Sequence, residues 1–241
     1  MVMVFEKEYA LRGSDFDCCD RLHPSSVMDL FQDAAGIHAV ELGVGFDDLM
    51  ARQMIWVLTK VKYQVVGAAK RYERVRVRTW PLPAGKVTCR REYEIESLDG
   101  TPIVRGTSEW VVVHSEKRRV LPAGDIYPHE EYCTRQLFDG KLRKVPAIAA
   151  EGEGQRVVPA YTHLDINGHV NNTKYADYVM DLLQLPAGQT VTDWQIDYHR
   201  EVLHGQELRL YRDEQDGITV VCGKSGEGET MFSCAVTVKE S

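Results

Sequence analysis

Apolar and polar positions along the chain follow two periods, and the same order of periods occurs twice. Residues 27–42 place apolar side chains three or four positions apart, as a helix with one buried face requires, and residues 175–183 repeat that spacing. After each segment, apolar and polar side chains alternate, which predicts half-buried strands. The expected strands span 55–63, 75–79, 87–96 and 104–114 in the first half, and 194–199, 208–212, 218–222 and 230–239 in the second. The pattern therefore predicts an α+β fold of two copies, each a long helix followed by about four antiparallel strands.

Polar residues predict where each helix begins. Ser25 or Ser26 can cap the first helix, with Pro24 before it. Asn171 and Asn172 can cap the second, which the Pro-Ala-Gly stretch after it ends.

The repeat also predicts the domain organisation. An offset of 148 positions superimposes the helices, with Tyr175 over Val27. A region rich in Pro, Gly and charge separates the copies, so we expect an N-terminal domain over 1–122, a connector over 123–156 and a C-terminal domain over 157–241. About 30 residues is long for a structureless loop, so the connector should contain a short helix or pack along the surface.

The run that carries chemistry is 165–172, Asp-Ile-Asn-Gly-His-Val-Asn-Asn, directly before the second helix. Asp165, Asn167 and His169 alternate, so in an extended segment they share one side. The helix start beyond them offers free N–H groups and a partial positive charge, which suits a carbonyl oxygen that gains negative charge. The competing interpretation is a polar turn that only caps the helix, which leaves His169 without a role.

The first copy separates these two interpretations. At the same offset its aligned residues are Asp17, Cys19 and Arg21, so a similar helix is kept without the amide and the imidazole. A cap alone does not require them, and we therefore expect the chemistry in the second copy only.

Composition narrows the function classes. A net charge of -7 and a pI of about 5.6 argue against a nucleic-acid binder, because binding phosphates requires a basic face. The six cysteines contain no C-x-x-C pair, and no metal or cofactor motif is found. Apolar runs are too short to span a bilayer, and residues 1–6 lack the features of a signal peptide, so a cytoplasmic protein without a membrane span is expected.

Several further segments, taken with 165–175, resemble the fatty acyl-ACP thioesterases of plants and bacteria, a double hot-dog family. The resemblance covers nearly the whole chain and includes residues 55–59, 78–80, 84–86, 90–91, 107–111 and 197–201. It implies two tandem hot-dog domains that hydrolyse acyl-ACP to free fatty acid and holo-ACP, ending fatty acid synthesis, with no metal or organic cofactor. It also implies that the N-terminal domain shapes the acyl-chain pocket, with Trp56 among the lining residues.

The resemblance assigns site residues one by one. Asp165, Asn167 and His169 match the family's active-site Asp, Asn and His, and Glu201 matches its glutamate. The next position, a cysteine in the plant enzymes, is Val202 here, so a thiolate route at that position is excluded.

Thioester hydrolysis needs a nucleophile, a proton carrier and a donor to the carbonyl oxygen. Asn167 can supply the donor, His169 can donate a hydrogen bond or move a proton, and Glu201 can act as general base for water. Asp165 can orient His169 or the water, or can itself attack the thioester to give a transient anhydride. Both routes stay open at this point, with activated water preferred.

The expected partner is an acyl carrier protein, which is acidic and requires a local basic patch. The candidate clusters are Arg74, Arg76 and Arg78; Lys86, Arg90 and Arg91; and Lys117, Arg118 and Arg119. Arg90 and Arg91, with Trp56, are the expected substrate-binding residues, and a homodimer is one expected oligomeric state. Two rival functions remain: an acyl-CoA thioesterase with the same site, and a non-catalytic acyl-binding hot-dog protein.

Overall fold

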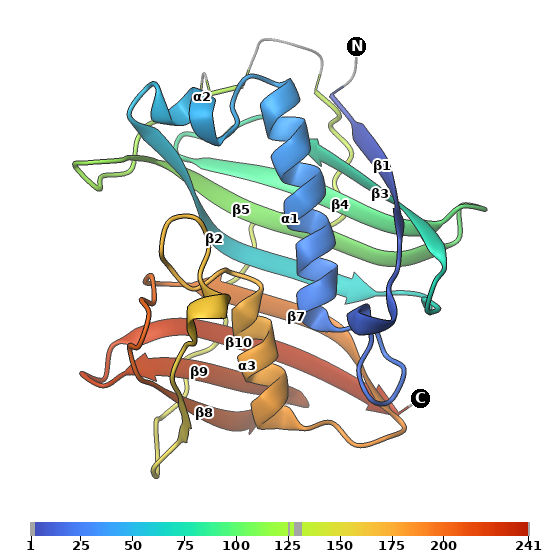
Figure 1. Ribbon diagram of the computed structural model, residues 1–241, viewed down its shortest axis with the longest axis vertical. Helices are drawn as coiled ribbons and strands as arrows, with labels where there is room; N and C mark the ends of the chain where they lie inside the picture. Colours follow the sequence, from blue (N-terminus) through green and yellow to red (C-terminus); the bar gives the residue numbers. More distant parts are fainter. Residues whose placement is uncertain (1–2, 125, 128–131, 241) are drawn as a thin grey trace. The chain divides into compact units, whose positions relative to one another are not determined.

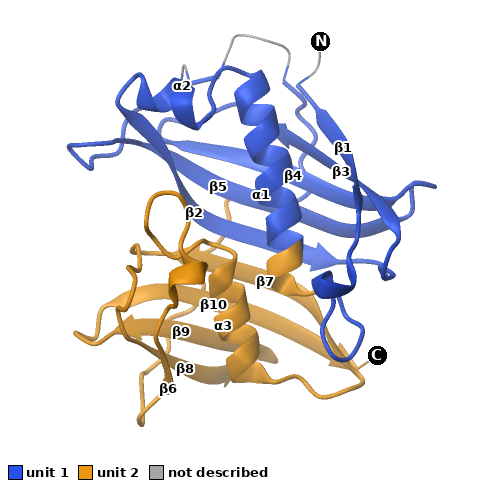
Figure 2. Ribbon diagram, in the orientation of Figure 1, with its two compact units in different colours: residues 1–22, 27–140 blue, residues 23–26, 141–241 orange. Residues whose placement is uncertain are grey.

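The computed structural model describes residues 3–124, 126–127 and 132–240, and it divides into two compact units (Figure 2). Unit 1 contains Met1–Leu22 and Val27–Gly140, and unit 2 contains His23–Ser26 and Lys141–Ser241. Residues 125 and 128–131 of the expected connector lie outside the described residues, as does the first part of the run 1–6 on which the signal-peptide expectation rests.

Unit 1 is an antiparallel sheet with a long helix against one face (Figure 1). Its strands, in spatial order, are β1 (Phe5–Ala10), β3 (Arg74–Pro81), β4 (Thr88–Ser97), β5 (Pro102–His114) and β2 (Met54–Val65). Helix α1 (Pro24–Glu41) packs through Phe31, whose ring stacks on Tyr93 with centroids 4.3 Å apart. Gly106 on β5 lies under that ring, and any side chain there would collide with it. The short helix α2 (Phe46–Met50) follows α1.

Unit 2 repeats this arrangement with a shorter helix (Figure 1). Its strands, in spatial order, are β7 (Gln189–Tyr198), β10 (Thr230–Glu240), β9 (Ile218–Ser225), β8 (Leu208–Gln215) and β6 (Gln155–Val157). Helix α3 (Lys174–Leu183) packs through Tyr175, which meets the rings of Tyr198 and Phe232 edge-on at 5.3 and 5.1 Å. A short 3-10 turn precedes each long helix, Gly13–Asp15 in unit 1 and Tyr161–His163 in unit 2.

The predicted fold class and all eight predicted strands are confirmed, whereas the expected helix caps are wrong. Helix α1 begins at Pro24 itself, which places Ser25 and Ser26 inside its first turn. Proline is well suited to a first helical position, where its missing N–H is not needed. The residue before α3 is Thr173, and Asn171, two residues earlier, accepts the Thr173 N–H at 3.0 Å.

Part of the connector packs along unit 1. The backbone N–H of Leu137 donates to Glu92 on β4 at 2.7 Å, and Trp80 Nε1 donates to the carbonyl of Arg135 at 2.9 Å. Arg90 donates to the carbonyls of Phe138 and Gly140, each at 2.6 Å. From 132 to 154, all of which is described, the connector contains neither helix nor strand.

Candidate active site

The run 165–170 folds into a closed turn around one carboxylate. Oδ1 of Asp165 accepts the backbone N–H groups of Asn167 at 2.8 Å and His169 at 3.2 Å. The Asp165 N–H donates to the His169 carbonyl at 2.8 Å. Gly168 has φ of 76°, a left-handed conformation that glycine adopts without strain. The aspartate therefore uses its oxygens to fix the backbone from which Asn167 and His169 project.

A second segment, far along the chain, lies against this turn. The Val170 N–H donates to the Val202 carbonyl at 2.8 Å, and His169 forms an isolated antiparallel bridge with Leu203. These contacts bring Nε2 of His169 to 3.5 Å from Oε2 of Glu201. The two side chains are 27% and 39% exposed, so water and substrate can reach both. The structure thus brings together the imidazole and the carboxylate that the resemblance predicts.

The other two predicted residues take distinct places. Asn167 Nδ2 donates to Oδ2 of Asp165 at 3.3 Å, which leaves the second N–H of that amide for another acceptor. Asp165 holds the backbone of His169 through the contacts above, whereas the imidazole Nε2 lies 3.5 Å from the Glu201 carboxylate. We find no contact between the Asp165 side chain and the His169 ring that would support the expected role of Asp165 in orienting that ring.

The helix start is prepared by Asn171. Its Oδ1 accepts the N–H of Thr173 at 3.0 Å and the Thr173 hydroxyl at 3.2 Å, while its own N–H donates to the His163 carbonyl at 2.9 Å. These bonds set the direction in which the chain enters α3.

Tyr175 and His163 lie next to the site, and the sequence does not assign either of them to it. Burial raises the pKa of the Tyr175 phenol well above its ordinary value, and negative charge at Glu201 and Asp165 adds to that effect. His163 Nδ1 lies 2.7 Å from the Tyr178 hydroxyl on α3. Helical spacing marks both tyrosines as core residues, and only the 148-residue alignment, which sets His163 against Asp15, draws attention to His163.

The expected substrate-binding residues of unit 1 lie inside that unit. Trp56 is half buried, donates from Nε1 to the Val44 carbonyl at 2.9 Å and stacks on Tyr127. Arg91 is only 4% exposed and contacts Nδ1 of His38 at 3.0 Å. Arg90 is tied to the connector carbonyls and to Glu92, 2.9 Å away. Because the side chains of Arg90 and Arg91 are largely buried, the structure does not support a role for them in docking a partner at the surface.

The remaining basic clusters differ in their described ion pairs and in their exposure. The three arginines of β3 form cross-strand ion pairs with acids of β1 and β4: Arg74 with Glu8, Arg76 with Glu6, Glu8 and Glu96, and Arg78 with Glu6 and Glu96. Lys117, Arg118 and Arg119 are all exposed on the turn after β5. The 117–119 turn is therefore the better basic candidate.

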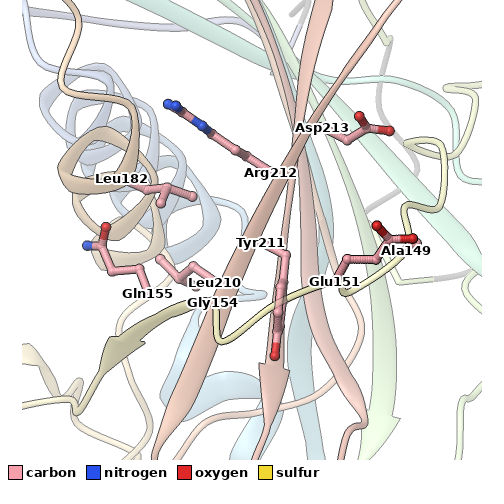
Figure 3. A pocket seen from close by; sticks show the side chains of 9 residues that line it. All are labelled: Ala149, Glu151, Gly154, Gln155, Leu182, Leu210, Tyr211, Arg212 and Asp213. Carbon is pink, nitrogen blue, oxygen red and sulfur yellow. The ribbon is translucent and has the colours of Figure 1, made fainter.

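A pocket of about 400 Å³ opens at the edge of unit 2, around β8 (Figure 3). Its lining residues are Ala149, Glu151, Gly154, Gln155, Leu182, Leu210, Tyr211, Arg212 and Asp213. They include none of the four predicted catalytic residues, so this pocket is separate from the His169–Glu201 pair.

In the described part of the chain, none of the helices combines the length and the hydrophobicity that a membrane span requires. Within the same residues, no three His, Cys, Asp or Glu side chains are grouped closely enough to hold a metal ion.

Comparison with known proteins agrees with this architecture. The family model described as the acyl-ACP thioesterase N-terminal domain matches residues 2–127, and that of the C-terminal domain matches residues 148–239. An acyl-[acyl-carrier-protein] hydrolase of Cuphea viscosissima is 26% identical over 94% of this chain and 57% of its own length. A palmitoyl-acyl carrier protein thioesterase of Gossypium hirsutum is 27% identical over 96% of this chain and 59% of its own length. The chain thus spans somewhat more than half the length of these curated relatives.

Among solved structures, an acyl-ACP thioesterase from Bacteroides thetaiotaomicron superimposes with a TM-score of 0.87. The match covers 98% of each chain at 22% identity, and it supports the fold.

Proposed function

The chain belongs to the acyl-ACP thioesterase family, and from that premise we propose that it hydrolyses the thioester of fatty acyl-ACP to a free fatty acid and holo-ACP. The observation that carries the proposal is the solvent-accessible His169–Glu201 pair, 3.5 Å apart, beside a turn that presents the Asn167 amide.

In the proposed reaction, water attacks the thioester carbon and Glu201 takes the proton that the water loses. The remaining N–H of Asn167 binds the carbonyl oxygen while its charge develops, a contribution of about 10²–10³ in rate for such a donor. His169 carries a proton from Glu201 toward the sulfur as the C–S bond breaks. The products are a carboxylic acid and the carrier's thiol, and the carboxylate and imidazole return to their starting state.

The contacts favour activated water over an anhydride at Asp165. Oδ1 of Asp165 accepts two backbone N–H groups and Oδ2 accepts the Asn167 amide, so attack by this carboxylate would sacrifice the bonds that hold the turn. Glu201 faces the imidazole instead. General-base catalysis through this pair leaves the turn intact.

The substrate and partner also follow from family membership. We assign the acyl chain to a pocket shaped by unit 1 near Trp56, and the acidic carrier protein to the 117–119 turn, whose three cations are exposed. A cytoplasmic location is part of the proposal, because all six cysteines are free thiols, as a reducing compartment maintains them.

The test compares acyl-ACP and acyl-CoA carrying the same acyl groups, with thiol release as the readout. We expect hydrolysis of both with a higher kcat/KM for acyl-ACP. A higher kcat/KM for acyl-CoA would select the acyl-CoA thioesterase, and acyl-chain binding without thiol release would select a non-catalytic binding protein. Light scattering of the same sample tests the homodimer expected from the sequence.

A further inference from the structure

Exposed apolar side chains in unit 2 are concentrated around the candidate active site. Among the described residues of unit 2, four large hydrophobic side chains are exposed: Ile166 at 85%, Tyr161 at 79%, Leu203 at 52% and Val158 at 41%. Ile166 and Leu203 lie on the two short segments that carry the predicted catalytic residues, and the Tyr161 ring contacts His204 beside Leu203. We call Ile166, Tyr161 and Leu203 the site rim.

The members of the site rim lie close to the reacting groups. Ile166 lies at the tip of the turn, between Asp165 and Asn167. Leu203 is the bridge partner of His169, and the Tyr161 ring meets His204, next to Leu203, edge-on at 6.5 Å. The site rim therefore borders the His169–Glu201 pair.

The degree of exposure indicates the size of the partner. Ile166 and Tyr161 are about four-fifths exposed, and neither lines the pocket around β8, so most of each side chain projects outward. Clustered exposed apolar side chains mark protein–protein or membrane contacts, and projecting aromatic and aliphatic anchors that fill a partner's pockets carry much of the binding energy at protein interfaces. The partner that binds the site rim is therefore expected to be a macromolecule.

The position of the site rim selects which macromolecule. A permanent partner, such as a second copy of the chain or a membrane, would cover His169 and Glu201 and block the substrate. The occupant must arrive and leave with each turnover. Resting on the proposed function, we propose that the site rim is the docking surface for the body of the carrier protein that presents the thioester. Binding at the site rim is apolar.

This proposal predicts discrimination between carriers. Free acyl-CoA has no protein body to bury Ile166, Tyr161 or Leu203, so these side chains should assist only the protein-bound substrate. The site rim would then be the source of a preference for acyl-ACP over acyl-CoA.

The experiment substitutes Ile166→Ser and Leu203→Ser in the full chain and measures both substrates. Each change should raise KM for acyl-ACP about tenfold, as loss of an interface anchor does, with kcat unchanged. Turnover of acyl-CoA with the same acyl group should not change. The matched control is Leu98→Ser, an exposed leucine on the hairpin turn of unit 1, which should leave both substrates unaffected.

Four results would overturn the proposal. Equal losses on acyl-ACP and acyl-CoA would mean that the site rim shapes the site itself, and no loss on either would mean that it binds nothing. A change of oligomeric state in Ile166→Ser would assign the surface to contacts between copies. If the wild-type chain hydrolyses neither substrate, the proposed function fails but the site rim is still tested. In that case holo acyl carrier protein should bind the wild type and bind Ile166→Ser at least tenfold more weakly, and equal binding would overturn the proposal.

Discussion

The two copies build the same turn around an aspartate, and they use it differently. In unit 1, Oδ1 of Asp17 accepts the N–H groups of Cys19 at 2.8 Å and Arg21 at 3.0 Å. In unit 2, Asp165 accepts the corresponding N–H groups at 2.8 and 3.2 Å. Each aspartate also donates its own N–H to the carbonyl four residues later, at 2.8 Å in both turns. Even the left-handed residue is matched, Asp20 at φ 62° and Gly168 at φ 76°.

The difference lies in the side chain at the end of each turn. Arg21 folds back onto Asp17 as an ion pair at 2.7 Å, so the side chain that ends the first turn pairs with the aspartate of the same turn. His169, at the aligned position, faces Glu201 on another segment. The aspartate is therefore a structural feature common to both turns, and the chemistry depends on what the second turn adds at Asn167, His169 and Glu201.

The largest effect is expected when the imidazole of His169 is removed. His169→Ala should lower kcat by about 10²–10⁴, as loss of a positioned proton carrier does, with little change in stability because the side chain is partly exposed. Glu201→Ala should have a similar effect. Steady-state kinetics on acyl-ACP checks both.

The matched control is Arg21→Ala, the aligned position of unit 1. It should leave kcat unchanged and lower the free energy of unfolding by about 1 kcal/mol through loss of a partly buried ion pair. Wild-type turnover in His169→Ala, or a large loss in Arg21→Ala, would overturn the division of labour between the two turns.

The comparison extends to the helices, because α1 buries a histidine that α3 lacks. His38 is 4% exposed, and the aligned residue of the second copy is Pro186, beyond the end of α3. Burial, and then the positive charge of Arg91, lower the pKa of His38 to about 4. The unfolded chain takes up this proton near pH 6.5, so stability is complete above that pH and falls as the pH drops toward 4, by about 3 kcal/mol in total.

Thermal unfolding measured from pH 7 to pH 4 checks this expectation. The His38→Gln variant, which keeps an acceptor for Arg91, should lose that part of the pH dependence. A wild-type Tm that stays constant between pH 6.5 and 4.5 would show that His38 does not control acid stability.

The next comparison separates the charge of each aspartate from its role as acceptor. Asp165→Asn keeps an oxygen for the two N–H groups, so the turn should fold while kcat falls about tenfold, because the Asn167 amide loses its charged partner. Equal kcat in Asp165→Asn and wild type would show that only the acceptor matters.

The unit 1 counterpart should affect stability alone. Burial raises the pKa of Asp17, but the N–H groups of Arg21 and Cys19 and the Arg21 guanidinium outweigh it, so the pKa lies below its ordinary value. Its stabilising effect is present above about pH 4 and is lost as the pH falls through the lowered pKa. Asp17→Asn should therefore lower Tm at pH 7, with the difference from wild type shrinking in acid, and should leave kcat unchanged.

Local patterns predicted most of the fold and three of the four candidate site residues. Periodicity located both long helices and eight strands, but it passed over β6, which has three residues, and β1, whose glutamates pair with the arginines of β3. Without β1, those arginines looked like a basic patch. Alternation along β4 already puts Arg91 on the same face as Cys89 and Tyr93, both buried, so its burial was readable from the pattern.

The candidate site shows the same limit. Asp165, Asn167 and His169 could be identified because they are neighbours in sequence. Glu201 came from family resemblance, since its approach to His169 depends on the Val170–Val202 and His169–Leu203 contacts, which no local period encodes. The direction of the Asp165 side chain, toward backbone N–H groups, likewise depends on the closed turn.

The smallest effect is expected at Val202, the position next to Glu201 where the plant enzymes carry cysteine. Val202 is fully buried, and its carbonyl accepts the Val170 N–H, so this residue holds the Glu201 segment to the His169 turn. A cysteine side chain there would be shielded from substrate, and burial would raise its pKa, as it does for Cys234. Val202→Cys should therefore keep kcat within about twofold of wild type, since hydrolysis by the carboxylate and imidazole makes no use of a thiol.

Inactivation by iodoacetamide should proceed at the same rate in the variant and the wild type, whose own exposed Cys18 provides the background. A gain in kcat that iodoacetamide abolishes only in the variant would show that this position reaches the thioester, and it would place the nucleophile on the Glu201 segment in place of water.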